Sequence, residues 1–329
     1  MHLTLLAPGL LWPDQILRDA TYDLPLPALS LLLGRGRRVM LAGIDAWLAQ
    51  AFGLPAPLPA AALRLLGDGG TPGDDYWLCL DPVHLRVDER GMTIDDPRQL
   101  ALSAEEDAAL RRSVAAALAA EPVAPVPGRW HLRLAEPAAL DTRALSQSVG
   151  CPAAPDLPAG PDGPHWRRLL ADIQPLLHAD AVNRRRDDAG RPTANSLWPW
   201  GGGRLPAGAR RAFDRLQTGD PVLRGIALLA GIDLDPMPAR FQHDNSNVLA
   251  RYDRLTAPAA AFDAAAWRDA LAALERDWLA PAQTALNSGR LRQLTLIAEG
   301  GGRALAVTAR RRDLWRFWRK PLDLAQLPA

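Results

Sequence analysis

The stretch "TANSLWPWGGGRLP" (193–206) places two tryptophans beside a run of three glycines. Because tryptophan is bulky and glycine has no Cβ, we predict a loop here rather than a regular helix or strand. Two interpretations stay open. In the first, Trp198 and Trp200 shape a pocket, Asn195 and Arg204 offer polar contacts, and the glycine amides approach an anion. In the second, the rings pack into the core and the glycines let the chain turn without Cβ clashes.

Composition limits the function classes. The 329 residues suffice for one large domain or two ordinary ones. A net charge of +1 argues against binding of a polyanion by the whole surface, so nucleic acid is an improbable partner. Cys79 and Cys151 lack metal-binding spacing and predict reduced thiols in a cytoplasmic protein with no metal and no cofactor.

The N-terminal segment "MHLTLLAPGLLWPD" (1–14) is apolar, but no Lys or Arg precedes its apolar run. Pro8 and Pro13 interrupt that run, so we predict no signal peptide. No run in the chain reaches the ~18 apolar residues that a membrane span needs. We therefore expect no membrane association.

Strand and helix patterns alternate at both ends of the chain. A short buried strand is predicted at 2–8 and a helix at 27–37, stopped by Gly34. Near the other end, the pattern predicts a helix closed by Gly231, a long helix and two strands joined by glycines; these cover 221–233, 262–286 and 291–309.

The middle of the chain, about 68–150, is richer in strand patterns. Asp81–Pro82 is expected to break a strand, and Ser103 with Glu106 forms a capping box before a helix. These segments predict an α/β core with an inserted α+β subdomain. Strands are predicted at 73–88, 91–96 and 129–136, Pro-rich breaks at 119–128 and 151–164, and helices at 104–118 and 166–177. The predicted domains are 1–67 (core), 68–155 (insertion) and 156–329 (core).

Four segments carry a family resemblance, and they occur in the same order along both chains. They are "PGDDYWLCLDPVHLRVDERGMTIDD" (72–96), "PGRWHLRL" (127–134), "HADAVNRRRDDAGRPTANSLWPWGGG" (178–203) and "PVLRGIALLAGID" (221–233). Together they resemble the archaeal-type cofactor-independent phosphoglycerate mutases. The resemblance implies an alkaline-phosphatase-like core sheet flanked by helices, with an inserted domain, which agrees with the pattern above.

A second resemblance is closer. "PGLLWP" (8–13), "NSLWPWGGG" (195–203) and "FWRKP" (317–321) resemble the RpfE-type bacterial regulatory proteins, a family named for the control of pathogenicity factors. The resemblance implies a regulatory role and gives no mechanism.

Comparison with the mutase family predicts that the chemistry is lost. Phosphomutases of this superfamily hold two divalent metals with Asp and His ligands and use a Ser as phosphoryl acceptor. Pro8 stands where the first strand of the enzymes ends in Asp, and Glu299 is the only carboxylate aligned with their Asp-His pair. The segment aligned with a later His, 310–320, has no His, and 43–67 holds no Ser or Thr. We therefore predict a pseudoenzyme without catalytic residues and without metal.

Several residues are candidates for ligand binding. The pair His243–Asp244 could bind a metal or a ligand, or form a surface loop. His84 is either a ligand contact or a buried histidine at a strand end. The mutase arginines that match the run at 184–186 contact substrate; the alternative is a solvated arginine run. From this region the candidates are Asn183, Arg184 and Arg186.

The segment "RRRDLWRFWRKP" (310–321) predicts a helix with Trp315 and Trp318 three residues apart and with Arg312 and Arg319 among its cations. Three interpretations stay open: a helix that packs its tryptophans on the core, a surface for a protein partner, or stacking on single-stranded nucleic acid.

Three functional hypotheses follow. The first is a non-catalytic regulatory protein that acts through a protein partner or a small phosphorylated metabolite. The second is a phosphomutase-like or phosphohydrolase-like enzyme with a rebuilt site, which needs Glu299, His243, Asp244 and either Asp14 or Asp45 to converge. The third is a nucleic-acid accessory protein that uses the basic C-terminus.

Overall fold

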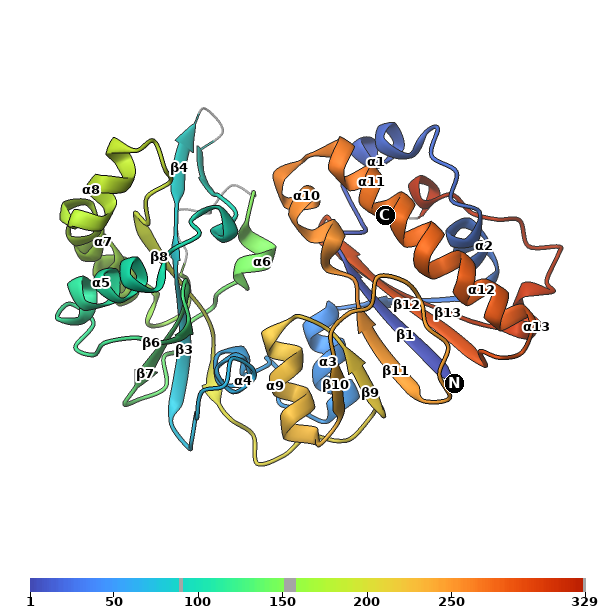
Figure 1. Ribbon diagram of the computed structural model, residues 1–329, viewed down its shortest axis with the longest axis horizontal. Helices are drawn as coiled ribbons and strands as arrows, with labels where there is room; N and C mark the ends of the chain where they lie inside the picture. Colours follow the sequence, from blue (N-terminus) through green and yellow to red (C-terminus); the bar gives the residue numbers. More distant parts are fainter. Residues whose placement is uncertain (89–90, 151–157, 328–329) are drawn as a thin grey trace. The chain divides into compact units, whose positions relative to one another are not determined.

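The computed structural model describes residues 1–88, 91–150 and 158–327 (Figure 1). The chain divides into two compact units. Met1–Ala56 and Gly208–Ala329 form the first, which we call the core unit; Pro57–Ala207 form the second, the inserted unit. Within the described ranges, no helix combines the length and the apolar character needed to cross a bilayer.

A seven-stranded sheet organises the core unit, in the order β10-β9-β11-β1-β12-β13-β2. The strands β10, β9, β11, β1 and β12 run parallel, and β13 runs antiparallel to both of its neighbours. Their bounds are β1 (His2–Pro8), β2 (Arg37–Leu41), β9 (Arg215–Gln217), β10 (Asp233–Asp235), β11 (Asn247–Arg251), β12 (Gln293–Gly300) and β13 (Arg303–Arg310).

Helices cover both faces of this sheet. Leu3, Leu5 and Ala7 of β1 belong to one apolar cluster with residues of α1, α2, α11 and α12, whereas Leu6 does not, because successive side chains of a strand point to opposite faces. α3 contacts β12 and β2, and α9 contacts β9 and β10. The helices are α1 (Asp14–Thr21), α2 (Pro27–Arg35), α3 (Ile44–Phe52), α9 (Pro221–Ala230), α10 (Thr256–Ala261), α11 (Ala264–Leu274), α12 (Ala280–Asn287) and α13 (Arg311–Leu314).

Most elements predicted for the core unit are confirmed. The strand at 2–8 is β1, and Gly231 closes α9 with a φ of 62°. The long predicted helix is α11 and α12, joined by a π-helical turn at Glu275–Leu279. The structure departs from the sequence prediction at two elements. α2 continues through Gly34, and the edge strand β2 was not predicted, because four of its five residues are exposed and show no alternation.

The inserted unit contains a four-stranded sheet, β6-β7-β3-β8, and the hairpin β4–β5. Leu78 and Leu80 of β3 face α5 and α7, and Trp77 and Cys79 face α4 on the other side. The capping box of Ser103 is formed. The elements are α4 (Ala60–Gly67), β3 (Tyr76–Val83), β4 (Leu85–Asp88), β5 (Gly91–Ile94), α5 (Ala104–Ala115), β6 (Val123–Val126), β7 (Arg129–Leu134), α6 (Leu145–Ser148), α7 (Gly163–Ala179), α8 (Ala181–Asp188) and β8 (Ser196–Arg204).

The unit boundaries differ from the predicted domains. The sequence predicted an insertion over 68–155, whereas 57–207 form one compact unit. The reason is that β8 pairs along β3, and α4 packs on both strands. This long-range pairing leaves no local signal in the sequence. The Pro-rich break at 119–128 contains the strand β6, and half of the predicted loop at 151–164 lies outside the described residues.

The Trp-Gly stretch is a strand, so the prediction of an irregular loop was wrong. β8 pairs antiparallel with β3 from Ser196 to Arg204, with a register shift opposite Trp77 and Cys79. The prolines do not break the pairing. Among the described residues, β8 has β3 as its only neighbour, and β7 reaches β3 only as far as Cys79, so Pro82 and Pro199 each have a side with no described strand partner.

The glycines allow α4 to approach β8 closely. A Cβ at Gly203 would lie 2.4 Å from Cβ and 2.9 Å from Cα of Pro59. A Cβ at Gly201, whose φ is +66°, would lie 2.8 Å from Cβ of Ala60. The bare backbone therefore permits contact between helix and strand that any side chain would prevent.

We expect Gly203→Ala to destabilise the inserted unit by about 1–3 kcal/mol, because the backbone of α4 would have to move. Urea unfolding followed by circular dichroism measures this. Gly208→Ala is the matched control, since nothing lies within 4 Å of its Cβ position. Equal stability of the two variants would contradict the close approach.

Candidate functional site at the carboxyl edge of the core sheet

The carboxyl ends of the parallel strands bring several sequence-predicted positions together. Pro8, the last residue of β1, stands beside Glu299 of β12 in the register of the sheet. The amide N–H of Gly9 donates to the backbone oxygen of Glu299 at 2.8 Å. Open α/β sheets bind their ligands at this edge, which makes it the first place to look for a site.

Glu299 is engaged by the start of α3. Its Oε1 accepts the backbone N–H of Ile44 at 3.0 Å, next to Asp45. Burial, followed by the negative charges of Glu299 and Asp220, raises the pKa of Asp45 to about 6, although Arg251 opposes the shift. Solvent still reaches Asp45. Two carboxylates from segments far apart in the sequence therefore influence each other here.

An arginine lies beside these carboxylates. Arg251, the last residue of β11, donates from Nε to Asp253 Oδ1 at 2.6 Å, and its Nη2 lies 3.5 Å from Asp220 Oδ2. Burial alone would lower the pKa of Arg251, but Asp220 and Asp253 hold that pKa above its ordinary value. The guanidinium stays charged and adds a fixed positive charge to this edge.

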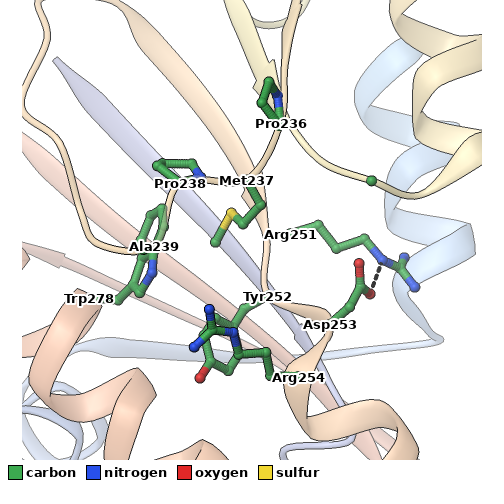
Figure 2. A pocket seen from close by; sticks show the side chains of 10 residues that line it. Pro236, Met237, Pro238, Ala239, Arg251, Tyr252, Asp253, Arg254 and Trp278 are labelled. Atoms are coloured by element: carbon green, nitrogen blue, oxygen red, sulfur yellow. Dashed lines mark hydrogen bonds and ion pairs between the residues drawn. The ribbon is translucent and has the colours of Figure 1, made fainter.

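A cavity of about 280 Å³ opens at the same edge, beyond the ends of β9, β10 and β11 (Figure 2). Apolar and cationic side chains share its lining. Trp278 is 1% exposed, and its indole Nε1 has no hydrogen-bond partner among the described residues. A buried donor without an acceptor costs about 1–3 kcal/mol, so a ligand acceptor that reached this N–H would be favoured. The lining residues are Gly219, Pro236, Met237, Pro238, Ala239, Arg251, Tyr252, Asp253, Arg254 and Trp278.

The residues at this edge do not fit the two-metal site that the mutase resemblance implies. Proline offers no donor, and the carboxylate of Glu299 already accepts an amide. The guanidinium of Arg251 lies beside the carboxylates, where a divalent cation would meet its charge. Over the described part of the chain, no three His, Cys, Asp or Glu side chains gather in a way that could hold a metal ion.

His243 and Asp244 lie at the opposite, amino edge of the sheet. Asp244 Oδ1 accepts the backbone N–H of Ser246 just before β11 begins, and His243 Nε2 donates to the backbone oxygen of Arg290, just before β12. β12 rises about 20 Å from its start to Glu299. The structure thus brings Asp45 to Glu299 and keeps the His-Asp pair away from both.

The candidates of the inserted unit make internal contacts. Asn183 donates to the backbone oxygens of Leu177 and Ala194, and Asn195 bonds both backbone groups of Leu85. Arg186 is buried, with its Nε 2.7 Å from the oxygen of Pro192 and its Nη1 2.9 Å from Glu106 Oε2. The hydrogen bonds of these polar groups stabilise the turns that precede β8.

Three further candidates lie closer to the surface. Nδ1 of His84 donates to the backbone oxygen of Thr193 at 2.7 Å, at the junction of β3 and β4. Arg184 is exposed on α8. Arg204 is exposed at the end of β8 and donates to the backbone oxygen of Asp74. The described structure places no second candidate side chain in contact with any of the three.

The two tryptophans of β8 pack inward and use their N–H groups inside the unit. Trp198 Nε1 donates to the backbone oxygen of Arg143 at 3.0 Å. Trp200 Nε1 donates to Asp81 Oδ2 at 2.8 Å, and the guanidinium carbon of Arg64 stands 5.2 Å from the centre of its ring. This geometry is that of the second interpretation, in which the rings pack into the core.

The buried ion pair of Arg64 and Asp81 was not predicted from the sequence. Arg64 is 4% exposed and Asp81 is 2% exposed, and two parallel N–H···O bonds of 2.7 and 2.8 Å join them. A third arginine bond reaches the backbone oxygen of Trp130. The signal was present, because Arg64 is the one charge in the apolar run "AAALRLLG" (60–67), and a buried charge requires a partner.

His131 completes this cluster as a neutral base. Burial, together with the positive charge of Arg64, lowers the pKa of His131 to about 3. Its Nδ1 donates to the backbone oxygen of Val123, and its Nε2 accepts Nε of Arg64 at 3.1 Å. Burial raises the pKa of the free thiol of Cys79, with Arg64 opposing the shift. Cys151 lies outside the described residues.

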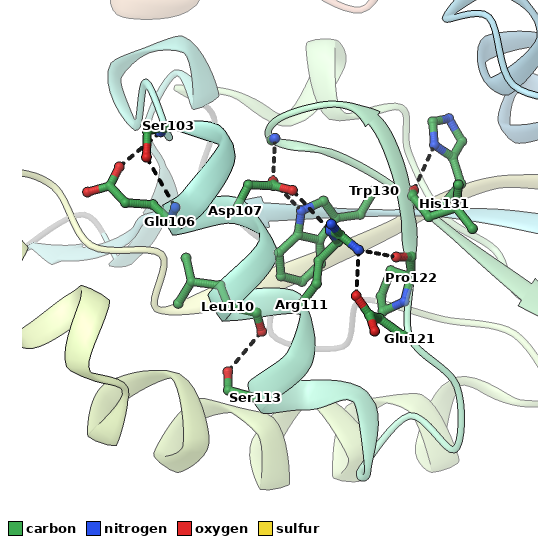
Figure 3. A network of polar contacts seen from close by, with 12 residues as sticks. Ser103, Glu106, Asp107, Leu110, Arg111, Ser113, Glu121, Pro122, Trp130 and His131 are labelled. Atoms are coloured by element: carbon green, nitrogen blue, oxygen red, sulfur yellow. Dashed lines mark hydrogen bonds and ion pairs between the residues drawn. The ribbon is translucent and has the colours of Figure 1, made fainter.

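A second polar network supports the same sheet from α5 (Figure 3). The carboxylate of Asp107 accepts Nε1 of Trp130 and the amide of Gly128, both at 2.7 Å, and Nε of Arg111 at 3.0 Å. Arg111 continues to Glu121 at 2.7 Å. These contacts are satisfied internally and fix the position of Trp130, whose backbone in turn bonds Arg64 and Asp81.

The predicted C-terminal helix is confined to α13, Arg311–Leu314. Trp315, Phe317 and Trp318 follow it in turns and are exposed, so the prediction that both tryptophans lie on a helix was wrong. Asp313 stabilises the start of α13, since its carboxylate accepts the backbone N–H of Arg310, and it also pairs with Arg316. Arg312 and Arg319 are also exposed.

Comparison with known proteins gives a consistent but distant relationship. No protein-family model matches the chain. The 2,3-bisphosphoglycerate-independent phosphoglycerate mutase of Methanosarcina mazei is 33% identical over 85 residues, which are 24% of this chain and 21% of that enzyme. The corresponding enzyme of Methanosarcina acetivorans is 30% identical over 98 residues, 28% of this chain and 24% of that enzyme. The matched region thus spans less than a quarter of the length of these curated relatives.

Solved structures extend the likeness to the whole fold. The cofactor-independent phosphoglycerate mutase of Thermoplasma acidophilum covers 99% of this chain over 94% of its own, with a TM-score of 0.50 and 15% identity. The PH0037 protein of Pyrococcus horikoshii gives a TM-score of 0.52, 12% identity and coverage of 99% and 91%. The fold is therefore the mixed α/β, alkaline-phosphatase-like fold of these two solved structures, as the resemblance implied. Similarity to the mutases is distant in both sequence and structure.

We expect Arg64→Met to destabilise the inserted unit by about 3–5 kcal/mol, because Asp81 would remain buried without its counter-charge. Chemical unfolding measures the loss. The double variant with Asp81→Leu should recover part of it. Arg133→Met is the control: Arg133 pairs with Asp75 in an exposed position, and its loss should cost no more than about 1 kcal/mol. A mild effect of Arg64→Met would refute a buried, mutually dependent pair.

The raised pKa of Asp45 predicts a pH-dependent stability. Between its ordinary pKa near 3.8 and about 6, the unfolded chain has released the proton that the folded protein keeps. The folded state is therefore progressively destabilised as pH rises through this window. Asp45→Asn should gain about 0.5–1 kcal/mol relative to the parent between pH 4 and pH 7.5, a small gain because solvent reaches the group. A pH-independent difference in the free energy of unfolding would show that the pKa of Asp45 is ordinary.

Proposed function

We propose that the chain is a non-catalytic regulatory protein of the RpfE type, built on a phosphoglycerate-mutase-like fold, that acts in the bacterial cytoplasm through a bound metabolite or a protein partner. The observation that carries the proposal is the pair Pro8 and Glu299. They stand side by side at the carboxyl edge, where the related enzymes place metal-binding residues. One residue has no donor atom, and the other bonds a backbone amide.

Arg251 supports the same proposal. A phosphoryl-transfer site of this class uses two divalent cations to neutralise the transferring group. Here a guanidinium, already paired with Asp220 and Asp253, supplies the positive charge at this edge. A single fixed cation favours an anion but generates neither an activated hydroxyl nor a phosphoryl acceptor. Binding can therefore survive the loss of chemistry.

The cavity beside Arg251 is the proposed metabolite site. Arg254 and Trp278 line it together with Met237 and the flanking prolines. This mixture suits a small phosphorylated metabolite, with the anion near the arginines and the carbon skeleton against the apolar wall.

A second candidate is an enzyme with a rebuilt acid–base site. The observation that favours it is the raised pKa of Asp45 beside Glu299, since perturbed carboxylates concentrate at active sites. Against it stands the position of His243 and Asp244 at the other edge of the sheet. Only two members of the required set come together.

The test combines metal content, activity and ligand binding of the purified protein. We expect no stoichiometric manganese or zinc by elemental mass spectrometry and no conversion of 3-phosphoglycerate. A panel of phosphorylated metabolites should contain one that stabilises the protein, by about 2.7 kcal/mol at one hundred times its Kd. Arg254→Ala should abolish that shift, and Arg224→Ala, an exposed arginine on α9, should retain it.

Two outcomes would overturn the proposal. Two equivalents of bound metal with mutase activity would restore the catalytic interpretation. Metal-free turnover that Asp45→Asn abolishes would favour the rebuilt enzyme.

A further inference from the structure

Three large aromatic side chains project from the core unit directly after α13. Trp315 is 66% exposed, Phe317 is 81% exposed and Trp318 is 69% exposed. Three such residues within four positions form a concentrated apolar patch, unlike the scattered apolar residues of an ordinary surface. No function described above uses them.

Hydrogen bonds from α2 and an ion pair with α13 fix the turn that carries these rings. Arg35, at the end of α2, donates to the backbone oxygens of Leu314 and Arg319, at either end of the turn. Arg316 pairs with Asp313 at 3.0 Å. The aromatic turn is therefore preorganised, which lowers the entropy that a partner must remove on binding.

The surface around the rings is strongly basic, although the chain as a whole carries a charge of only +1. Asp313, the acidic residue of this segment, is buried and paired. The adjacent edge strand β2 begins with two more exposed arginines, and Arg37 lies opposite Thr308 of β13. The cations of the segment itself are Arg310, Arg311, Arg312, Arg316, Arg319 and Lys320.

A hollow of about 340 Å³ lies beside the rings. Leu314, Trp315, Phe317 and Asn287 line it. Its walls are mostly apolar, and its size suits one bulky side chain. An apolar pocket with aromatic walls and an arginine rim is the usual architecture of a binding hot spot.

We propose that this surface, comprising the aromatic turn 315–318, its basic rim and the hollow, docks an acidic segment of a partner protein that inserts one bulky apolar side chain into the hollow. The inference rests on the proposed function, because it names the chemistry of the partner through which a non-catalytic protein acts. Charge complementarity steers the encounter and the inserted side chain supplies most of the affinity.

The geometry favours a protein segment over two other anionic partners. Phe317 and Trp318 meet edge to face, at 82° with centroids 5.3 Å apart, so they do not offer the parallel faces on which successive bases stack. A bilayer surface would satisfy the cations and the projecting rings, but it has no discrete side chain for the hollow.

The test uses the full-length protein and fluorescein-labelled synthetic peptides rich in Asp and Glu with one central Leu. We expect fluorescence anisotropy to show peptide binding that weakens at high salt. A peptide with Gly in place of Leu, and a peptide with Lys in place of the acidic residues, should each lose this binding. Trp315→Ala with Phe317→Ala, and separately Arg312→Ser with Arg319→Ser, should each weaken binding by about tenfold or more. All four side chains are exposed, so the thermal midpoint should stay unchanged.

Matched controls separate the surface from general stickiness. Tyr22→Ala with Phe262→Ala removes two other exposed aromatics of the core unit, and Arg184→Ser with Arg185→Ser removes two exposed cations of α8; neither should affect binding. The same variants are measured with phosphatidylserine vesicles and with oligo-dT.

Several results would overturn the inference. The first is peptide binding that the aromatic and arginine variants do not weaken, and the second is no peptide binding at all. The third is that the protein binds vesicles or oligo-dT in preference to peptide and that the same variants abolish this binding. None of them restores metal binding or mutase activity, so failure of the docking surface remains distinguishable from failure of the proposed function.

Discussion

The parallel pairing of β1 with β11 and β12 is the constraint on which the candidate site depends. Because parallel strands end at one edge, residues separated by more than 240 positions in the sequence are forced together: Pro8 beside Glu299, with Arg251 at the end of the next strand. The edge is built whether or not its residues can do chemistry. Pro8 does not disturb the hydrogen bonds that create the edge, since Gly9 donates to the backbone oxygen of Glu299. Fold and activity can therefore separate.

The inserted unit shows the same separation in a different way. Its most distinctive sequence, the Trp-Gly stretch, serves the packing of the unit: Trp200 bonds Asp81, Asp81 pairs with Arg64, and the bare glycines let α4 lie against β8. A buried charge pair contributes little net stability when complete but is costly to break, so each member holds the others in place. These internal contacts give the motif a structural role that does not depend on catalysis.

The sequence predicted elements whose signal is local and missed those whose signal is distant. Neighbouring residues in the sequence suffice to predict the strand at 2–8, the capping box at Ser103 and the helices over 264–287. β8 was missed because its glycines and proline disfavour a strand, and only pairing with β3 overrides them. β2 was missed because an exposed edge strand has no alternating pattern. At the site, the family resemblance singled out Pro8 and Glu299, and the register of the sheet places them side by side. The roles of Arg251 and Trp278 were not, because nothing in their local sequence shows that they line one cavity.

The charge distribution links these observations. A nearly neutral chain that places cations in two places, at the carboxyl edge and on the C-terminal turn, leaves both suited to anions. At the edge, Arg251 is tied to Asp220 and Asp253, so its field is partly cancelled and suits a small ligand that also uses the apolar wall. On the turn, the cations are mostly exposed and only Asp313 opposes them, so the field reaches further into solvent and suits an extended partner. The two surfaces that we propose for anions therefore differ in their charge, and each suits the ligand proposed for it.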